Sequence, residues 1–215
     1  MIYASRDNEV FVNFFDSSTA ALKTPEGVVN VRQKSQFPVV GSTRVELTTP
    51  AGWTGVLHVR VPQWSENFTI KLNNRYEPLS RSDGYAAIPI EGASDYSIEI
   101  DFDIPLARCL LSGNDYALKR GPEVLSVDLR DNTDTWLGEN ELVSIPDQIS
   151  LNPVHHTDPW PGFRRTPERR RYRIDLKDKR TTELKEFVFT PYADAGNDGA
   201  AFRTIFPLAP KGGQS

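Results

Sequence analysis

Apolar and polar side chains alternate in four consecutive segments between Val56 and Phe102. The segments are residues 56–64, 68–74, 84–90 and 96–102, and turn residues separate them. A period of two is typical of a β-strand with one buried face and one face in water. The stretch therefore predicts the core of a β-sandwich.

The same alternation recurs on both sides of this stretch. It predicts further strands at residues 10–15, 28–33, 42–47, 116–119, 123–128, 171–177, 184–189 and 202–207. No long helical pattern is present. Proline interrupts the pattern at Ile104-Pro105, and turn residues follow at 112–115. We therefore predict an all-β chain of two consecutive antiparallel β-sandwich, jelly-roll-like domains: residues 1–111, and residues 112–215 with a C-terminal tail.

Charge and composition narrow the classes of partner. Lys and Arg number 25 against 29 Asp and Glu, a net charge of −4, which argues against nucleic acid as a partner. We interpret the arginine-rich run Arg164–Arg173 as a solvated strand face or a subunit contact. No apolar run approaches the roughly 18 residues of a membrane span, and the charged N-terminus argues against a signal peptide. We therefore expect no membrane association.

Residues with catalytic or metal-binding chemistry form no recognisable constellation. His155-His156 with Asp158 is interpreted as loop surface, since adjacent imidazoles point in different directions. Two acidic segments, Asp128 to Glu139 and Asp194 to Gly199, lack the spacing of a known calcium loop, and residues 131–141 are expected to be an acidic surface loop. The single cysteine, Cys109, excludes an internal disulfide and is expected to be buried and inert. The sequence thus predicts no catalytic residue, no metal ligand and no cofactor.

Tryptophans are the residues through which a sandwich binds sugars, because aromatic faces stack on the apolar faces of sugar rings. Trp64, directly after a strand and a proline, is expected to pack inside the domain. Trp136 and Trp160 lie in polar loops. These two are the candidate carbohydrate-binding residues.

Five short motifs carry a resemblance to a known family. In this order they are Arg60-Val61-Pro62-Gln63-Trp64, Asn73-Asn74, Gly84-Tyr85, Arg120-Gly121-Pro122 and Pro191-Tyr192-Ala193-Asp194-Ala195-Gly196. Together they resemble the C-terminal part of glycoside hydrolase family 127, the β-L-arabinofuranosidase family. The chain departs from the family at Asn73-Asn74, where asparagine-glycine is usual, and between Pro89 and Asp95, where a tryptophan and a glycine-aspartate are replaced.

The resemblance implies that catalysis and assembly belong to different domains. Family members carry their active site on an (α/α) barrel that precedes the sandwiches, where a glutamate and three cysteines hold zinc and one cysteine is the nucleophile. No such residue can be carried over to this chain. In the family the first sandwich packs on the barrel and the second helps to build dimers. A surface made to meet a barrel tends to be covered by association when it is bare, so we expect a homo-oligomer.

Three hypotheses about function follow. The first is a non-catalytic accessory region of a family 127-like protein that serves assembly and carbohydrate contact. The second is a part of an active β-L-arabinofuranosidase-like enzyme whose catalytic barrel lies on a missing or separate chain. The third is a free-standing carbohydrate-binding module.

Overall fold

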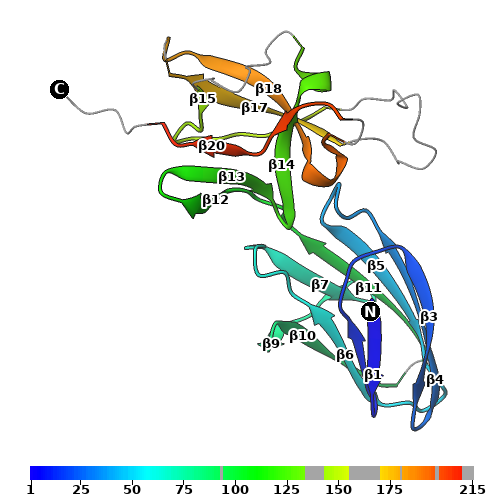
Figure 1. Cartoon of the computed structure of the whole chain (residues 1–215). Helices are drawn as coiled ribbons and strands as arrows, with labels where there is room; N and C mark the ends of the chain where they lie inside the picture. Colours follow the sequence, from blue (N-terminus) through cyan, green and yellow to red (C-terminus); the bar gives the residue numbers. More distant parts are fainter. Residues whose placement is uncertain (93, 134–142, 155–169, 180, 197–198, 210–215) are drawn as a thin grey trace. The chain divides into compact units, whose positions relative to one another are not determined.

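The chain forms two compact units, Met1–Ile104 and Pro105–Ser215, in a computed structural model (Figure 1). The structure describes residues 1–92, 94–133, 143–154, 170–179, 181–196 and 199–209. Within these ranges there are β-strands and two 3₁₀ turns, η1 (Leu129–Asp131) and η2 (Tyr192–Asp194), and no α-helix. No helix among the described residues is long and apolar enough to cross a membrane. The predicted all-β class is confirmed.

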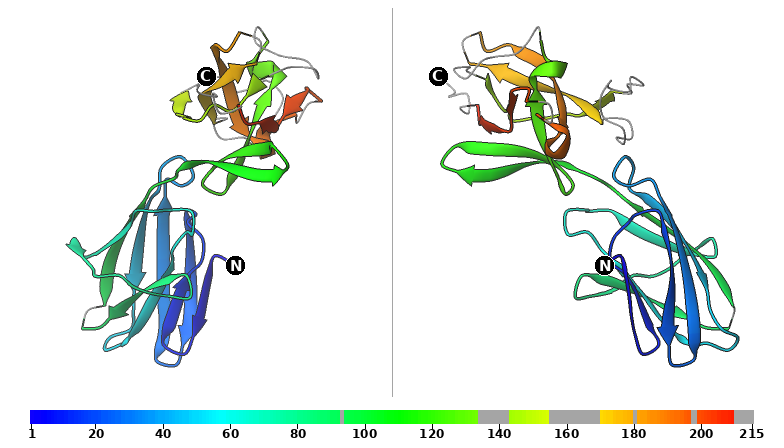
Figure 2. Two further views of the ribbon diagram at one scale, coloured as in Figure 1. Left: turned by 90° about the vertical axis from the view of Figure 1, so that its left-hand side faces the viewer. Right: turned by 45° about the vertical axis from the view of Figure 1, so that its right-hand side comes forward.

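Two sheets build the first unit (Figure 2). In sheet order, the five-stranded sheet contains β1 (Tyr3–Arg6), β2 (Glu9–Val12), β6 (Gly55–Arg60), β10 (Tyr85–Ile90) and β9 (Ser80–Ser82). The six-stranded sheet contains β3 (Ser18–Thr24), β4 (Gly27–Ser35), β5 (Ser42–Thr48), β11 (Asp95–Phe102), β7 (Phe68–Leu72) and β8 (Arg75–Tyr76).

One strand pair departs from the antiparallel pattern. β2 and β6 run parallel, with Val10 opposite Leu57. After β2 the chain crosses to the other sheet, forms β3, β4 and β5 there, and returns as β6 in the direction of β2. The other strand pairs of the described part are antiparallel, so the predicted sandwich carries one parallel pair.

The core of the first unit is built by the predicted alternation. Many inward residues of both sheets are at most 2% exposed, among them Val10, Leu57, Val59, Ile88 and Ile90 from one sheet, and Val31, Val45, Leu47, Ile70, Ile98 and Ile100 from the other. Trp53, in the connection between β5 and β6, is 1% exposed, and its Nε1 donates a hydrogen bond to Thr24 Oγ1 at 3.2 Å. A Cβ on Gly55 would lie 2.4 Å from the Trp53 ring, so the absence of a side chain there makes room for the indole.

A nine-stranded sheet builds the second unit. Its main path runs through β12 (Leu106–Ser112), β13 (Asp115–Arg120), β14 (Glu123–Asp128), β18 (Leu184–Pro191), β17 (Arg171–Asp178) and β15 (Val143–Ser144). Three short strands pair outside this path: β16 (Asn152–Val154) with β17, β19 (Phe202–Arg203) with β14, and β20 (Ile205–Pro207) with β13. The sheet encloses a core that includes Leu118, Leu125, Ile174, Leu176, Phe187, Phe189 and Phe206.

Strand β12 marks a difference from the sequence-based picture. The units divide after Ile104, whereas the sequence-based boundary lies at residue 111. β12 pairs with β13, with Leu106 opposite Arg120, so its backbone hydrogen bonds belong to the second unit. It is an edge strand with mostly solvent-facing side chains, so it lacks the alternation that marks a half-buried strand. For the same reason Cys109 is half-exposed rather than buried as expected.

Candidate functional site

The outward side of the five-stranded sheet carries a group of aromatic and polar side chains, which we call the aromatic face. It consists of Phe11 from β2, His58 and Arg60 from β6, Tyr85 from β10, and Asn13 just after β2. Strand alternation sends Val10, Val12, Leu57 and Val59 inward and therefore turns Phe11, His58 and Arg60 outward. All five side chains are half-buried.

The members of the aromatic face contact one another closely. The rings of Phe11 and His58 are stacked, with centroids 4.5 Å apart and an interplanar angle of 10°. The Tyr85 ring meets Phe11 edge-on at 5.7 Å, and the Arg60 guanidinium lies over Tyr85 at 5.2 Å. Tyr85 OH donates a hydrogen bond to Asn13 Oδ1 at 2.7 Å.

A carboxylate borders this face. His58 Nε2 lies 3.4 Å from Glu9 Oε1, and Arg6 Nη2 lies 2.8 Å from Glu9 Oε2. The hydrogen bond from Arg6, followed by that from His58, holds the pKa of Glu9 below its ordinary value against the opposing effect of burial. Glu9 is therefore an anion that helps to fix the position of the imidazole.

The outward side of the six-stranded sheet has a different character. Ion pairs cross it: Arg32 and Lys34 each approach Glu46, at 3.8 and 3.5 Å, and Arg44 lies 2.5 Å from Glu99. The side chains of the three cations are more than half exposed. Exposed charges of this kind are typical of a face in water, whereas partly buried aromatic side chains with arginine are typical of a binding surface.

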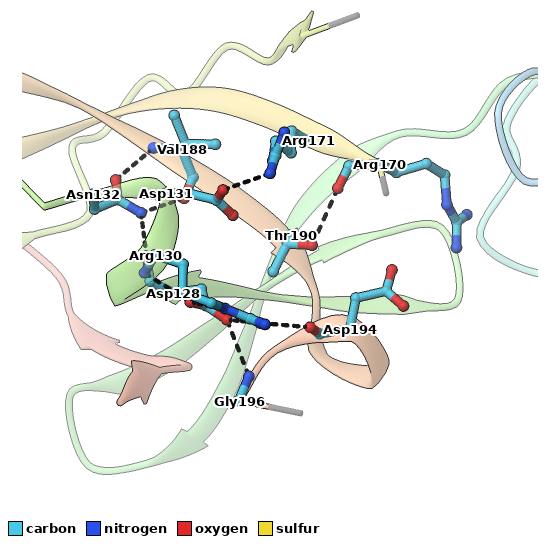
Figure 3. Close-up of polar contacts among 10 residues, drawn as sticks. All are labelled: Asp128, Arg130, Asp131, Asn132, Arg170, Arg171, Val188, Thr190, Asp194 and Gly196. Atoms are coloured by element: carbon cyan, nitrogen blue, oxygen red, sulfur yellow. Dashed lines mark hydrogen bonds and ion pairs between the residues drawn. The ribbon is translucent and has the colours of Figure 1, made fainter. Parts of the chain in front are cut away.

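A buried carboxylate organises one corner of the second unit, shown in Figure 3. Asp128 ends β14 and is fully buried. It accepts hydrogen bonds from Arg130 N at 2.9 Å, from Arg130 Nε at 2.8 Å and from Gly196 N at 3.0 Å. Arg130 Nη2 also donates to the carbonyl oxygen of Asp194 at 3.1 Å. Asp128 thus ties the end of β14 to the segment that follows β18.

Asn132 extends this arrangement, which we call the Asp128 network. Its amide nitrogen donates to the carbonyl oxygens of Asp128 and Val188, at 2.7 and 2.9 Å, and its Oδ1 accepts from Val188 N at 2.8 Å. The side-chain amide thus pairs with the backbone of β18 as a neighbouring strand would. Asn132 is buried and Asp131 is half-buried with a 7% exposed side chain, so these two residues of the predicted acidic surface loop turn their side chains away from water.

Arginines of the predicted basic run surround the network. Arg171 lies 2.9 Å from Asp131, Arg170 2.6 Å from Glu123, and Arg173 3.4 Å from Glu186. Burial raises the pKa of the Glu123 carboxyl above its ordinary value, although the charge of Arg170 opposes this. Each of these arginines therefore faces a carboxylate, which suits a structural role better than phosphate binding. The exclusion of nucleic acid stays a prediction.

The structure brings two of the five family motifs together and places two others at one end of a strand pairing. Arg60 and Tyr85, from two motifs of the first unit, lie opposite each other on β6 and β10. In the second unit Arg120-Gly121-Pro122 precedes β14, and Pro191 lies opposite Leu125 where β18 pairs with β14. At the Asn73-Asn74 turn both residues have positive φ, 47° and 65°, which asparagine tolerates better than most residues; this explains how asparagine replaces the usual glycine.

One of the three tryptophans singled out in the sequence, Trp64, lies among the described residues. Trp136, Trp160, His155, His156 and Asp158 lie outside the described residues. Trp64 is half-buried, and its ring lies 6.1 Å from that of Phe37 and 5.8 Å from that of Phe102, in line with the expected packing role.

Metal binding finds no support in the described ranges. They contain no group of three or more His, Cys, Asp or Glu side chains that could hold a metal ion. The zinc site of the resembling family needs three cysteines, and Cys109 is the only cysteine of the chain, so these residues do not fit that site.

Sequence reasoning missed one exposed aromatic pair. Tyr192, at the start of η2, and Phe202, at the start of β19, have ring centroids 5.8 Å apart at an angle of 70°. The available signal was the proline and tyrosine that follow the predicted strand 184–189, because tyrosine, like tryptophan, offers an aromatic face to a sugar ring.

Comparisons with known proteins relate the chain to glycoside hydrolase family 127. Residues 9–104 match the family model described as the middle domain of β-L-arabinofuranosidase GH127. No curated protein matches the sequence. A GH127 β-L-arabinofuranosidase from Geobacillus stearothermophilus T6 is similar in structure, with a TM-score of 0.78 and 18% identity over 97% of this chain and 35% of that chain. A second GH127 β-arabinofuranosidase gives a TM-score of 0.77 and 17% identity over 97% of this chain and 36% of that chain.

The chain therefore spans about a third of the length of these solved relatives, and the TM-scores show a common fold. The family model covers most of the first unit and stops at residue 104, whereas for the second unit the solved structures show likeness of fold. Residues 9–104 thus match the GH127 middle-domain model, and the resemblance of this chain to the β-sandwich region of glycoside hydrolase family 127 is confirmed.

Proposed function

We propose that this chain is a non-catalytic β-sandwich region of a GH127-like glycoside hydrolase, and that its aromatic face docks against a catalytic part. The observation that carries the proposal is the contrast between the two outward faces of the first unit. Ion pairs cover one of them, and Phe11, His58 and Tyr85 cover the other. Partly buried aromatic rings with an arginine are the residue types that protein interfaces favour.

The arrangement of the aromatic face suits a rigid docking role. The rings of Phe11 and His58 stack on each other. One hydrogen bond from its hydroxyl group and one cation–π contact with its ring fix the Tyr85 side chain. Side chains fixed in this way lose little freedom when a partner covers them. Small neighbours on the same face, Ala4 and Ala87, flank Phe11 and His58 in the strand register and leave the rings accessible.

A hydrolysis assay tests the non-catalytic part of this proposal. The isolated chain is expected to release no p-nitrophenol from p-nitrophenyl β-L-arabinofuranoside, with or without added zinc, under conditions in which a complete GH127 enzyme turns over. The reason is that no described group of residues provides a nucleophile with a base. Turnover that copurifies with the chain and changes with mutations in it would contradict the accessory role and favour the second hypothesis.

Self-association tests the docking surface. Without a catalytic part the aromatic face is bare, so the isolated chain is expected to form a homo-oligomer whose population rises with concentration. Sedimentation velocity over a concentration series measures this directly. A chain that stays monomeric across the series would contradict the expectation.

A further inference from the structure

We propose that Tyr192 and Phe202 form a saccharide-binding platform on the second unit. Their side chains are 55% and 42% exposed, whereas Phe187, Phe189 and Phe206 of the same unit are at most 2% exposed. The two rings lie 5.8 Å apart and meet at 70°, so they form a corner. The apolar face of a sugar ring stacks on one such ring while its edge meets the other.

The Asp128 network holds the two ring-bearing segments in place. Gly196 N donates to Asp128, and Arg130 donates to the carbonyl oxygen of Asp194, which fixes the segment that begins at Tyr192. Leu129 N donates to the carbonyl oxygen of Ala201 at 2.9 Å, and Phe202 lies opposite Asp128 where β19 pairs with β14. The Asp128 carboxylate thus holds the Tyr192 side of the platform, and the backbone of β14 and Leu129 holds the Phe202 side.

A glycine determines where the Phe202 ring lies. Gly196 has φ +66°, and a Cβ built on it would lie 2.5 Å from Phe202 Cδ1. The ring therefore packs directly on the backbone of Gly196, which only glycine permits. Because the ring is positioned before any ligand arrives, binding costs little conformational entropy.

The surroundings of the rings favour a small ligand over a protein partner. Among the described neighbours in sequence, Ala193, Gly199 and Ala201 are exposed and have small or no side chains. Two rings by themselves provide far less than the roughly 800 Å² per partner of a stable protein interface. Asp194 and Arg203 lie in the same two segments and are half-exposed, and charged planar groups of this type donate to or accept from sugar hydroxyl groups.

The site rests on the ring pair alone, and only the choice of sugar rests on the proposed function. Because the relatives of similar fold are β-arabinofuranosidases, polysaccharides that contain arabinofuranose are the appropriate probes. Failure of this proposal would leave the docking role of the first unit untouched, since hydrolysis and sedimentation test that role separately.

Affinity gel electrophoresis of the full chain in soluble arabinan and in arabinoxylan tests the platform. The wild type is expected to be retarded, and Tyr192→Ala and Phe202→Ala are each expected to weaken binding by about tenfold, the factor that ~1.4 kcal/mol produces. Tyr192→Phe keeps the ring and is expected to retain most of the binding. Tyr76→Ala, which removes an exposed tyrosine of the first unit, is the matched control and is expected to change nothing.

Thermal melting of each variant separates loss of binding from loss of folding, and Tyr192→Phe keeps the test valid if an alanine variant unfolds. Three results would overturn the proposal: no retardation of the wild type in either polysaccharide, retardation that both alanine variants preserve, or retardation that is lost on Trp136→Ala or Trp160→Ala and kept in Tyr192→Ala. The last result would instead support the tryptophans that the sequence predicts.

Discussion

Replacement of Asp128 by alanine is expected to lower the free energy of unfolding of the second unit by about 3–5 kcal/mol, the usual cost of removing one partner of a buried ion pair. Asp128 is fully buried, and the Arg130 side chain is only 16% exposed, so the guanidinium cannot regain full hydration in the folded state. The variant also leaves Gly196 N without its acceptor. Asp128→Asn retains an acceptor oxygen and is expected to lose less.

Urea denaturation measures this loss, and hydrogen exchange followed by mass spectrometry locates it. Protection is expected to fall in β14, β18 and the segment after β18, and to stay unchanged in the first unit. Asp175→Ala is the control, because Asp175 is an exposed aspartate on β17 and its removal is expected to cost less than about 0.5 kcal/mol. Equal stabilities of the two variants would contradict the anchoring role of Asp128.

Trp53→Ala is expected to destabilise the first unit by about 3–5 kcal/mol, the range for removal of a large buried aromatic side chain. The indole is 1% exposed, is covered by a backbone that leaves no room for a Cβ at Gly55, and donates a hydrogen bond to Thr24. Its removal leaves a cavity that the surrounding strands close only in part. Trp53→Phe fills much of that space and is expected to cost less.

Urea denaturation also measures the loss of stability in Trp53→Ala. Hydrogen exchange is expected to show that protection falls only in the first unit. Tyr76→Ala serves as control, since Tyr76 is 71% exposed and its ring contacts the Lys71 ammonium group at the surface. A loss below 1 kcal/mol for Trp53→Ala would show that this residue is not part of the packed core.

The strands that have one buried face and one face in water were predictable from the sequence. β5, β7, β10, β11 and β17 lie within one or two residues of the predicted segments, because inward and outward side chains alternate along them. Strands without that contrast escaped prediction. β12 faces solvent along most of its length, β3 has no fully buried side chain, and β16 is only three residues long.

The polar corner of the second unit could not be predicted from local pattern. Asp128 and Gly196 are 68 residues apart, and Asn132 and Val188 are 56 apart, so only the tertiary fold brings them together. In sequence, Asp128, Asp131 and Asn132 have the composition of a surface loop. Arginines from β17 and from η1 make their burial favourable, and their positions depend on strand pairing that sequence periodicity does not specify.

The aromatic face was predictable from the sequence only in part. The alternation of β6 turns His58 outward, and its side chain is 19% exposed. The stacking of Phe11 on His58 depends on the parallel pairing of β2 with β6, which a pattern of antiparallel hairpins does not predict. The expectation of a docking surface thus came from the family resemblance, and the residues that form it came from the structure.

Sedimentation velocity of Phe11→Asp beside Val28→Asp tests the central claim most directly. Both residues are apolar and turn outward from strands, Phe11 on the aromatic face and Val28 on the charged side of the six-stranded sheet. The account predicts that the wild type and Val28→Asp self-associate alike as concentration rises, and that Phe11→Asp stays monomeric with its fold intact by circular dichroism. Self-association of Phe11→Asp equal to that of the wild type would contradict the assignment of the aromatic face as the docking surface.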